Sequence, residues 1–556
     1  MADRAFCFIQ PSIPAVHIKK CTIYNRILYF QYLALKNMKN ILLISVLLIY
    51  TATGLMAQAN TPLVYTIDLT TVKNDKLQVS LNVPPLSKKN LVFAFPKIIP
   101  GTYNISDFGK FVSELHAWDR TGKKLAVQHL TKDTWTISNA ANLRKITYSV
   151  EDIFDTRQKH IIYPMAATNF EAGQDYVLNL PGVVGFFEGF EGLPVHINFK
   201  KPLSFYASTA AIPVRTGETE DEFAYNSIHE AYDQPLMYNL PDTATVQAGI
   251  CSVLVSVYSP NKLVKASSVA GWLSTMLHAT LDYLNGKLLV DKYAFIYYFK
   301  PESAKHTFPP NLTGALEHTT SSFYYVKVKP EQELKQSIID MSSHEFLHII
   351  TPLTIASKEV KLFNYLQPHL SKHLWLYEGV TEYTAHHIQV KGELITPQEF
   401  YDILTEKIAT SRKLLNDSLS FTDLSKESAG RYASQFLNVY LKGAMIGACL
   451  DIYLLHLSKG TYGLKNLVHE LGVKYGRERF FNDDQLFETI VQMTYPEIGQ
   501  FFTDYVAGAR PIPYEYFFDL AGVEYLPKEH LMRPKKNPTP EELVVFNRWL
   551  KKDAGE

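Results

Sequence analysis

The 556-residue sequence lacks net charge and contains few cysteines. Lys plus Arg and Asp plus Glu both total 55, so no overall field attracts nucleic acid or an anionic membrane surface. The four cysteines form no CxxC pair, which excludes a Cys-rich zinc site. We therefore expect no nucleic-acid partner, and a small or peptidic ligand is the simpler expectation.

The cysteines also say little about disulfides. Cys7 and Cys21 lie in an N-terminal segment that we expect to be removed. A Cys251–Cys449 disulfide is possible, but the sequence cannot show that these two residues approach each other. The pairing stays open at this point.

No apolar run is long enough to be a clear membrane span. The longest, Ile41–Leu55, has about 15 residues, whereas roughly 20 are needed to cross a bilayer. Lys36 and Lys39 precede it and Ala57-Gln58-Ala59 follows it, which is the order of a secretory signal peptide. We expect export to the periplasm or the medium, and no stable membrane span after cleavage.

Residues 1–37 fit no part of a signal peptide. We interpret them as an extension before a true start at Met38, so that residues 1–59 form the leader. The sequence contains no internal repeats and no low-complexity tracts. Two to four domains are expected for this length.

The pattern after the leader changes along the chain. Residues 60–241 show short alternating strands separated by turn residues, which predicts an antiparallel β domain. Residues 242–415 should form a mixed α/β domain, with strands at 251–259 and 292–300 around a helix at 262–285. Residues 416–556 should be a helical C-terminal region. The expected fold is thus multidomain α+β. Helical periodicity predicts helices over 331–350, 373–389, 397–414, 433–456, 462–475 and 540–552.

The motif His344-Glu345-Phe346-Leu347-His348 lies in one of these predicted helices. Residues i and i+4 share a helix face, so both imidazoles can bind one cation. Glu345 is rotated about 100° from them around the helix and can reach a metal-bound water as a general base. The pattern predicts a zinc site, although a short motif can also occur by chance.

A catalytic zinc ion needs a third protein ligand and one open position. Thirty residues after His348 comes Glu378, on the next predicted helix, and we predict that it completes the site. Glu382 lies one turn further and could accept a hydrogen bond from a ligand imidazole. The alternative for Glu382 is an ordinary solvated helix acid.

Several separated segments resemble the glycyl aminopeptidases, a branch of the gluzincin metallopeptidases related to aminopeptidase N. They include a segment at 96–125 that contains PGTY, GALEH at 314–318, HEFLH at 344–348, a segment at 363–383 that ends in LWLYEGVTEY, YLKGAMIGACLDIYLL at 440–455 and PIPYEYFFDLAGVEY at 511–525. The matches span about Tyr65 to Tyr525. The resemblance implies a thermolysin-like catalytic domain after the β domain, with zinc as the cofactor.

The resemblance also implies roles for individual residues. Gly314, Ala315 and Glu317 correspond to an edge strand that pairs with the substrate backbone, on which the glutamate binds the free α-amine. Tyr440 corresponds to a tyrosine that donates to the oxyanion. Alternatively, Glu317 is a surface acid and Tyr440 a packed tyrosine.

The sequence departs from the family pattern in places. Ala315 replaces a second glycine, and Ile349-Ile350-Thr351-Pro352 replaces a Trp-Asn segment after the second histidine. Many members carry a C-terminal PDZ-like domain, and we expect this chain to lack it. Lys442 is interpreted as a helix residue whose charged end reaches solvent.

We therefore predict an exported zinc aminopeptidase that removes small residues such as Gly or Ala from peptides. An exported zinc endopeptidase and a peptide-binding module without catalysis are the alternatives. The intact Glu345 argues against the second alternative, because a binding module has no use for a general base. The sequence does not predict the oligomeric state.

Overall fold

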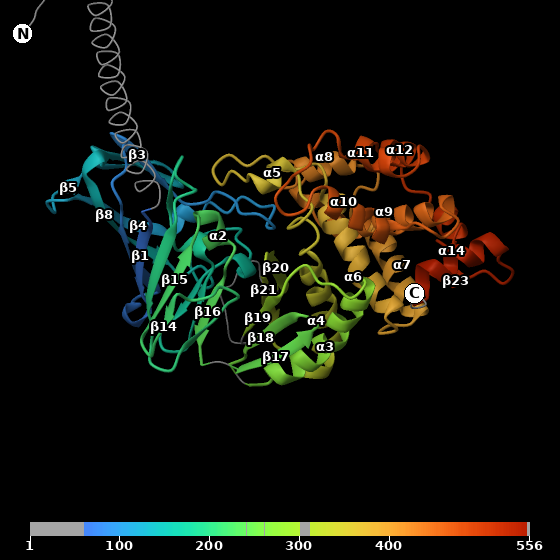
Figure 1. Ribbon diagram of the computed structural model, residues 1–556, viewed down its shortest axis with the longest axis horizontal. Coiled ribbons are helices and arrows are strands. Elements are labelled where there is room, and N and C mark those ends of the chain that lie inside the picture. The colour runs from blue at the N-terminus through green and yellow to red at the C-terminus, as the bar shows by residue number, and fades with distance from the viewer. Residues whose placement is uncertain (1–60, 241, 261, 301–311, 553–556) are drawn as a thin grey trace, which may run out of the picture. The chain divides into compact units, whose positions relative to one another are not determined.

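The computed structural model describes residues 61–240, 242–260, 262–300 and 312–552. The expected signal peptide and the extension before it lie outside these ranges. Residues 62–556 form one compact unit. In Figure 1 the N-terminal strands, the middle sheet with α3 and α4, and the C-terminal helices follow one another along this unit.

The N-terminal part is built on a large sheet with alternating buried and exposed side chains, as the period-two pattern predicts. All its pairs are antiparallel except β1 with β12, so the expectation of a purely antiparallel domain is wrong at that pair. In order, the strands are β14 (Arg215–Thr216), β15 (Glu220–Tyr225), β12 (Val195–Lys200), β1 (Leu63–Asp68), β2 (Lys76–Asn82), β8 (Leu143–Glu151), β4 (Val112–Asp119) and β5 (Lys124–Leu125).

Two smaller antiparallel sheets complete this part. One contains β13 (Tyr206–Ser208), β16 (Leu236–Asn239), β10 (Asp175–Leu178) and β9 (Asn169–Glu171). The other contains β11 (Phe186–Phe187), β3 (Asn90–Ala94), β7 (Thr134–Ser138) and β6 (Val127–Thr131). The short helix α2 (Ile228–Tyr232) precedes β16.

The middle part is a mixed sheet, called the catalytic sheet below, with helices α3 (Ala266–Tyr283) and α4 (Glu331–Leu347). Its order is β17 (Asp242–Ala248), β18 (Cys251–Tyr258), β19 (Lys292–Lys300), β21 (Ser321–Lys327) and β20 (Gly314–His318), so β20 is an edge strand. Acidic residues in the first turn of α4, Glu331 and Glu333, favour its N-terminus electrostatically.

An apolar core lies on each face of the catalytic sheet. The core of the N-terminal part includes Ile296, Tyr298, Leu316 and Phe323 from the sheet. A separate core joins the other face to α3 and α4. The N-terminal part and the catalytic sheet therefore share one continuous core.

Helices dominate the rest of the chain. Thr396 precedes the first helical residue, Pro397, and forms a capping box with Glu399. This fixes the start of α7 where the sequence predicts it. The helices are α5 (Lys358–Lys361), α6 (Val380–Lys391), α7 (Pro397–Leu414), α8 (Phe421–Lys426), α9 (Asn438–Leu457), α10 (Leu464–Lys474), α11 (Leu486–Met493), α12 (Glu497–Phe501), α13 (Tyr514–Asp519) and α14 (Pro540–Leu550). A hairpin of β22 (Val523–Leu526) and β23 (Leu531–Pro534) interrupts them.

Among the described residues, α9 alone is long and apolar enough to cross a membrane by length and composition. Most of it is buried in the core of the helical part, which is the ordinary setting of such a helix in a globular protein.

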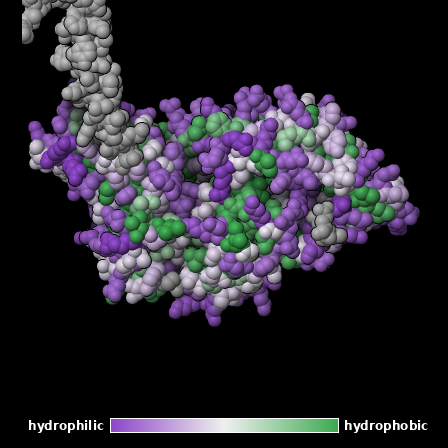
Figure 2. All heavy atoms as spheres, in the orientation of Figure 1, coloured by the Kyte–Doolittle hydropathy of each residue, from purple (hydrophilic) through white to green (hydrophobic). Residues whose placement is uncertain are grey.

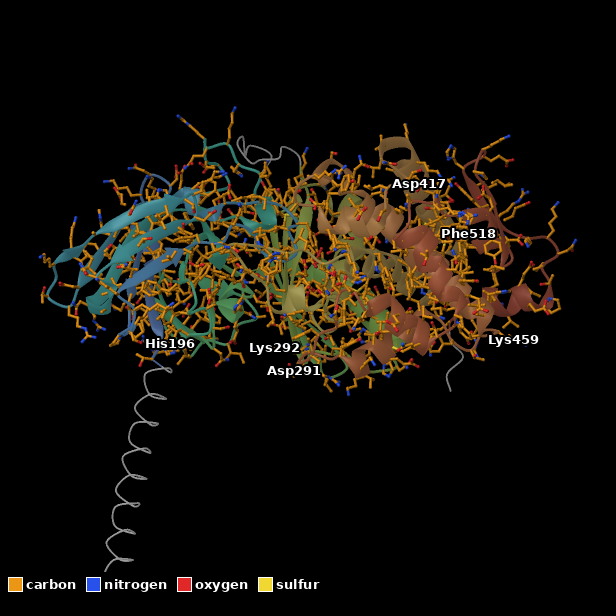
Figure 3. The ribbon with its side chains drawn as sticks, turned by 90° about the horizontal axis from the view of Figure 1, so that it is seen from above. His196, Asp291, Lys292, Asp417, Lys459 and Phe518 are labelled. Carbon is orange, nitrogen blue, oxygen red and sulfur yellow. The ribbon has the colours of Figure 1, made fainter. Side chains whose placement is uncertain are left out.

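Figure 2 shows hydrophobic residues gathered near the middle of one face, where Figure 1 places β20 and β21, with hydrophilic residues over most of the remainder. Figure 3 shows the same three parts, in the same order, from above. His196 lies in the N-terminal β domain, Asp291 and Lys292 lie at the start of β19, and the C-terminal helical part contains Asp417, Phe518 and Lys459.

Candidate metal centre and active site

The two motif histidines lie at the end of α4. His344 and His348 are both buried, and their ring centroids are 4.8 Å apart. Phe346, on the opposite side of the helix, packs edge-on against Tyr293 of β19 at 4.9 Å. This packing holds the helix against the catalytic sheet and turns both imidazoles away from it.

Glu378 reaches the same point from another element. Its Oε2 atom lies 3.3 Å from Nε2 of His344 and 3.7 Å from Nε2 of His348. The ligand atoms of all three residues lie within 4.8 Å of one another. The structure therefore brings the predicted ligands together.

A helical irregularity presents Glu378. Residues 375–379 form one π-helical turn ahead of α6, where the sequence predicts a regular helix over 373–389. Gly379 in this turn touches the backbone of Gly443 in α9. Single π turns are common at functional sites, because they redirect one side chain without ending the helix.

Hydrogen bonds fix the tautomers of both histidines. Nδ1 of His348 lies 2.7 Å from the carbonyl oxygen of Thr351, and a carbonyl can only accept, so this nitrogen carries the proton. Nδ1 of His344 donates in the same way to Glu382, at 2.7 Å. Nε2 of His348 therefore keeps a lone pair for a metal ion, and Nε2 of His344 would offer one on losing the proton that it shares with Glu378.

The converging atoms require a positive charge. Burial lowers the pKa of His348 to about 4, so this residue is neutral. Burial also opposes a charge on His344, but hydrogen bonds to Glu378 and Glu382 outweigh it and hold its pKa well above the usual value. Two nitrogen donors and one carboxylate are a donor set that suits Zn²⁺, whose positive charge would take the place of the proton on His344.

Glu345 lies next to this point, where the motif predicts it. Burial raises the pKa of its carboxyl to about 8, with a further contribution from Glu378. Carboxylate oxygens of Glu345 and Glu317 and one nitrogen of His348 also lie within 4.8 Å of one another. A dication at the site would lower the pKa of Glu345, because it favours the ionised form.

Glu382 is not a solvated helix acid. One carboxylate oxygen accepts from Nδ1 of His344, and the other accepts from Nζ of Lys407 at 2.5 Å and lies 3.3 Å from Nε2 of His386. Burial acts to raise the pKa of Glu382, but Lys407 and His344 hold it well below its usual value. The carboxylate is therefore ionised and accepts a hydrogen bond from His344, which is the first of the two possibilities that the sequence leaves open.

Tyr440 lies at the start of α9 beside the metal site. Its ring centroid is 5.7 Å from that of His344, and Phe436 packs edge-on against it. Burial and the negative charges of Glu378 and Glu345 raise its pKa well above the usual value. The phenol therefore remains a hydrogen-bond donor.

The predicted substrate strand, β20, is an edge strand of the catalytic sheet among the described residues. It pairs antiparallel with β21 on one side, with Gly314 opposite Tyr325, Ala315 opposite Tyr324 and Glu317 opposite Ser322. Burial and the charges of Glu378 and Glu345 raise the pKa of Glu317 well above its usual value, which places its half-buried carboxyl beside the site. A bound ammonium group would stabilise the ionised form.

Sequence reasoning missed one residue of the site, Tyr103. Its hydroxyl donates to Oε1 of Glu378 over 2.9 Å, although 275 residues separate them. Two positions earlier, Gly101 (φ +79°) lies against the carboxylate of Glu317. The PGTY match at 100–103 was the available signal, and it carried no role.

His318, His373, His386 and His387, to which the sequence assigns no role, are buried. Two expectations need correction. Lys442 is also buried and donates to the carbonyl oxygen of Asp417, so its charged end does not reach solvent. The possible disulfide does not form, because both of its cysteines are free and buried.

Two protein-family models match this chain, one over the N-terminal β domain and one over the region that contains the candidate site. Residues 64–239 match the N-terminal domain of the M61 peptidases, and residues 337–446 match the M61 glycyl aminopeptidase domain. The chain belongs to the M61 glycyl aminopeptidase family. The second match contains the two histidines, Glu345 and Glu378, and it ends six residues after Tyr440.

Solved structures of metallopeptidases share the fold. An aminopeptidase N family protein from Idiomarina loihiensis aligns with a TM-score of 0.70 at 19% identity, over 83% of this chain and 78% of that one. An M1 zinc metallopeptidase from Deinococcus radiodurans, bound to a Tyr-Ser-Ala substrate, aligns with a TM-score of 0.50 at 14% identity, over 82% and 95%. No curated protein gives a significant match. This M61 family member is a metallopeptidase, and its fold and family are those of metallo-aminopeptidases.

Proposed function

We propose that the chain is a zinc-dependent aminopeptidase that removes small N-terminal residues, such as Gly or Ala, from peptides. The convergence of His344, His348 and Glu378, with ligand atoms within 4.8 Å, carries the proposal. Glu317 supports the choice of an aminopeptidase, because it lies on a free strand edge beside these ligands. An extended peptide can add to such an edge by main-chain hydrogen bonds.

A zinc ion held by the three ligands would supply a Lewis acid and lower the pKa of a bound water. Glu345 then acts as general base, taking a proton from the attacking water and later giving it to the leaving amine. Its buried position beside the ligands supports this role. The exchange needs a carboxylate whose pKa lies near the working pH.

Tyr440 and Glu317 act on the substrate. The phenol of Tyr440, which stays protonated, donates a hydrogen bond to the carbonyl oxygen as negative charge develops there. The carboxylate of Glu317 pairs with the free α-amine and so fixes the cut after the first residue. The preference for small residues follows from the resemblance to the glycyl aminopeptidases.

A panel of aminoacyl-p-nitroanilides, with and without a chelator, tests the function. We expect the highest kcat/KM for Gly and Ala, loss of activity with chelator, and recovery with Zn²⁺. Internal cleavage of N-acetylated peptides, measured by mass spectrometry, would instead indicate an endopeptidase. Peptide binding without any cleavage would indicate a binding module.

We also propose that the protein is exported and acts in the periplasm or the medium. The support is the order of Lys36, the apolar run 41–55 and the Ala57-Gln58-Ala59 site in the sequence. N-terminal sequencing of the mature protein should give Asn60 as the first residue. A mature chain that retains residues 1–37 would contradict both this cleavage and the start at Met38.

A further inference from the structure

We propose that Tyr103, supplied by the N-terminal β domain, is a specificity-determining and positioning residue of the active site. Its ring forms the wall that limits the first substrate side chain to a small size, and its hydroxyl orients Glu378. The inference rests on the proposed aminopeptidase function and names the residue that sets its preference.

The hydroxyl is one half of the argument. Glu378 directs Oε2 toward both histidines, while Oε1 accepts the hydrogen bond from Tyr103 at 2.9 Å. With Oε1 occupied, Glu378 offers a metal ion a single oxygen in a fixed direction. Partners of this kind orient metal ligands, and their loss weakens metal binding by about 10–100-fold.

The ring is the other half. Tyr103 packs against Phe436 with centroids 5.5 Å apart, and Phe436 packs against Tyr440 at 5.6 Å, which in turn lies 5.7 Å from His344. Tyr103 donates to Glu378, and its loop neighbour Gly101 lies against Glu317. Burial, followed by the charges of Glu378 and Glu317, raises the pKa of Tyr103 well above its usual value. The ring is partly buried and packs against the apolar core of the helical part.

These neighbours define where a substrate would run. In the proposed mode the α-amine pairs with Glu317 and the first carbonyl lies between the metal ligands and Tyr440. The first Cα and its side chain then pass between these groups, where Tyr103 and Phe436 stand. In this mode the two packed aromatic rings, 5.5 Å apart, would stand beside the first side chain and restrict its size.

The backbone around Tyr103 is fixed. Tyr103 has φ +45° and Gly101 has φ +79°, both in the left-handed region. A Cβ on Gly101 would lie 2.6 Å from Oε2 of Glu317, so the loop fits closely around the proposed amine receptor. Lys97, earlier in the loop, donates its backbone N–H to the carbonyl oxygen of Tyr365 in the catalytic part.

Two substitutions separate the ring from the hydroxyl. Tyr103→Gly removes the ring and the hydroxyl together. Glycine tolerates the positive φ at this position, so the substitution removes the ring from the site without straining the backbone. Tyr103→Phe keeps the ring and removes the hydroxyl. Tyr206→Ala, at an exposed tyrosine of the same domain, is the control.

The experiment measures kcat/KM for Ala-, Leu- and Phe-p-nitroanilide and the Zn²⁺ dissociation constant by chelator competition. We expect Tyr103→Gly to raise the Leu-to-Ala ratio at least about 10-fold. Tyr103→Phe should keep that ratio within about twofold but weaken zinc binding by about 10-fold. The control should match the wild type in both measurements.

If the wild type is active and Tyr103→Gly has the same Leu-to-Ala ratio of kcat/KM, the ring of Tyr103 does not limit the first side chain. That result would leave the proposed function intact. A ratio that rises equally in Tyr103→Phe would also overturn it, because the ring is still present. Unchanged zinc affinity in Tyr103→Phe would overturn the positioning role. A zinc-loaded wild type that cleaves no aminoacyl substrate would overturn the proposed function, and the wall with it.

Discussion

Gly379 and Gly443 are in backbone contact: a Cβ added to Gly379 would lie 2.5 Å from the carbonyl carbon of Gly443. The first glycine follows the candidate metal ligand Glu378, and the second lies one turn after Tyr440. This contact sets the separation of the π turn from α9. It therefore also sets how Tyr440 stands relative to the metal ligands.

Gly379→Ala should destabilise the protein and weaken zinc binding, because the methyl group must push α9 away from Glu378. Overpacking of this kind costs about 1–3 kcal/mol. Thermal unfolding and zinc content measure the two effects. Gly271→Ala is the matched control: Gly271 lies in α3 with open space around it, and this exchange should be neutral or stabilising. Equal behaviour of the two variants would contradict the contact.

Glu345→Gln should retain zinc and lose turnover. The amide is nearly the same size but cannot accept the proton of the attacking water, so we expect kcat to fall by about 10²–10⁴-fold. Metal analysis and melting temperature should match the wild type. Turnover at the wild-type rate would refute Glu345 as the base.

Glu382→Gln should weaken zinc binding by about 10–100-fold. The loss follows because His344 donates to this carboxylate, and the neutral amide orients and polarises the imidazole less strongly. Chelator competition measures the change. Glu406→Gln, on the exposed side of α7, is the control and should leave the zinc affinity unaltered. Similar dissociation constants for both variants would argue against the orienting role.

Glu317→Gln should lower kcat/KM for peptides with a free amine by about 10–100-fold, since a charge-assisted hydrogen bond is replaced by a neutral one. The N-acetylated forms of the same peptides, measured as competitive inhibitors, provide the control, because they carry no ammonium group and should bind both proteins with the same inhibition constant. An inhibition constant that rises as much as kcat/KM falls would place Glu317 outside amine recognition.

The buried Asp175 predicts a pH dependence of stability away from the active site. Burial raises its pKa to about 7 from a usual value of 3.8, so the folded protein holds this proton more tightly than the unfolded chain. The contribution of Asp175 to stability is therefore greatest below the unfolded pKa and is lost as the pH rises toward 7.

Asp175→Asn keeps a neutral acceptor for the amide of Asn169 at every pH. Urea unfolding should show this variant to be more stable than the wild type at pH 8, by about 2 kcal/mol, with the difference shrinking toward pH 5. A difference independent of pH would indicate that Asp175 stays ionised in the fold.

The sequence predicts those parts of the site whose signal is local. The spacing of His344 and His348 on one helix face, and the glutamate on the following helix, suffice to place the metal ligands. The longer strands and helices are also predicted, because each has a clear period. The one-turn distance from Glu378 makes Glu382 a candidate partner for an imidazole, but the sequence does not distinguish this from a solvated helix acid; the hydrogen bond to His344 does.

The remaining features depend on contacts between distant segments. Tyr103 reaches Glu378 from another domain, and no periodicity marks it. The π turn at 375–379 arises where Gly379 meets Gly443, so a helical pattern alone cannot show it. The parallel pairing of β1 with β12 and the hairpin of β22 and β23 likewise depend on which strands become neighbours.

The core that β19, β20 and β21 share with the N-terminal strands has a practical consequence. The N-terminal β domain buries Ile296, Leu316 and Phe323. A fragment beginning at residue 242 would therefore expose a hydrophobic face of the sheet to water. Such a fragment should aggregate rather than work as a smaller peptidase. Attempts to shorten this enzyme should trim other regions and keep both halves joined.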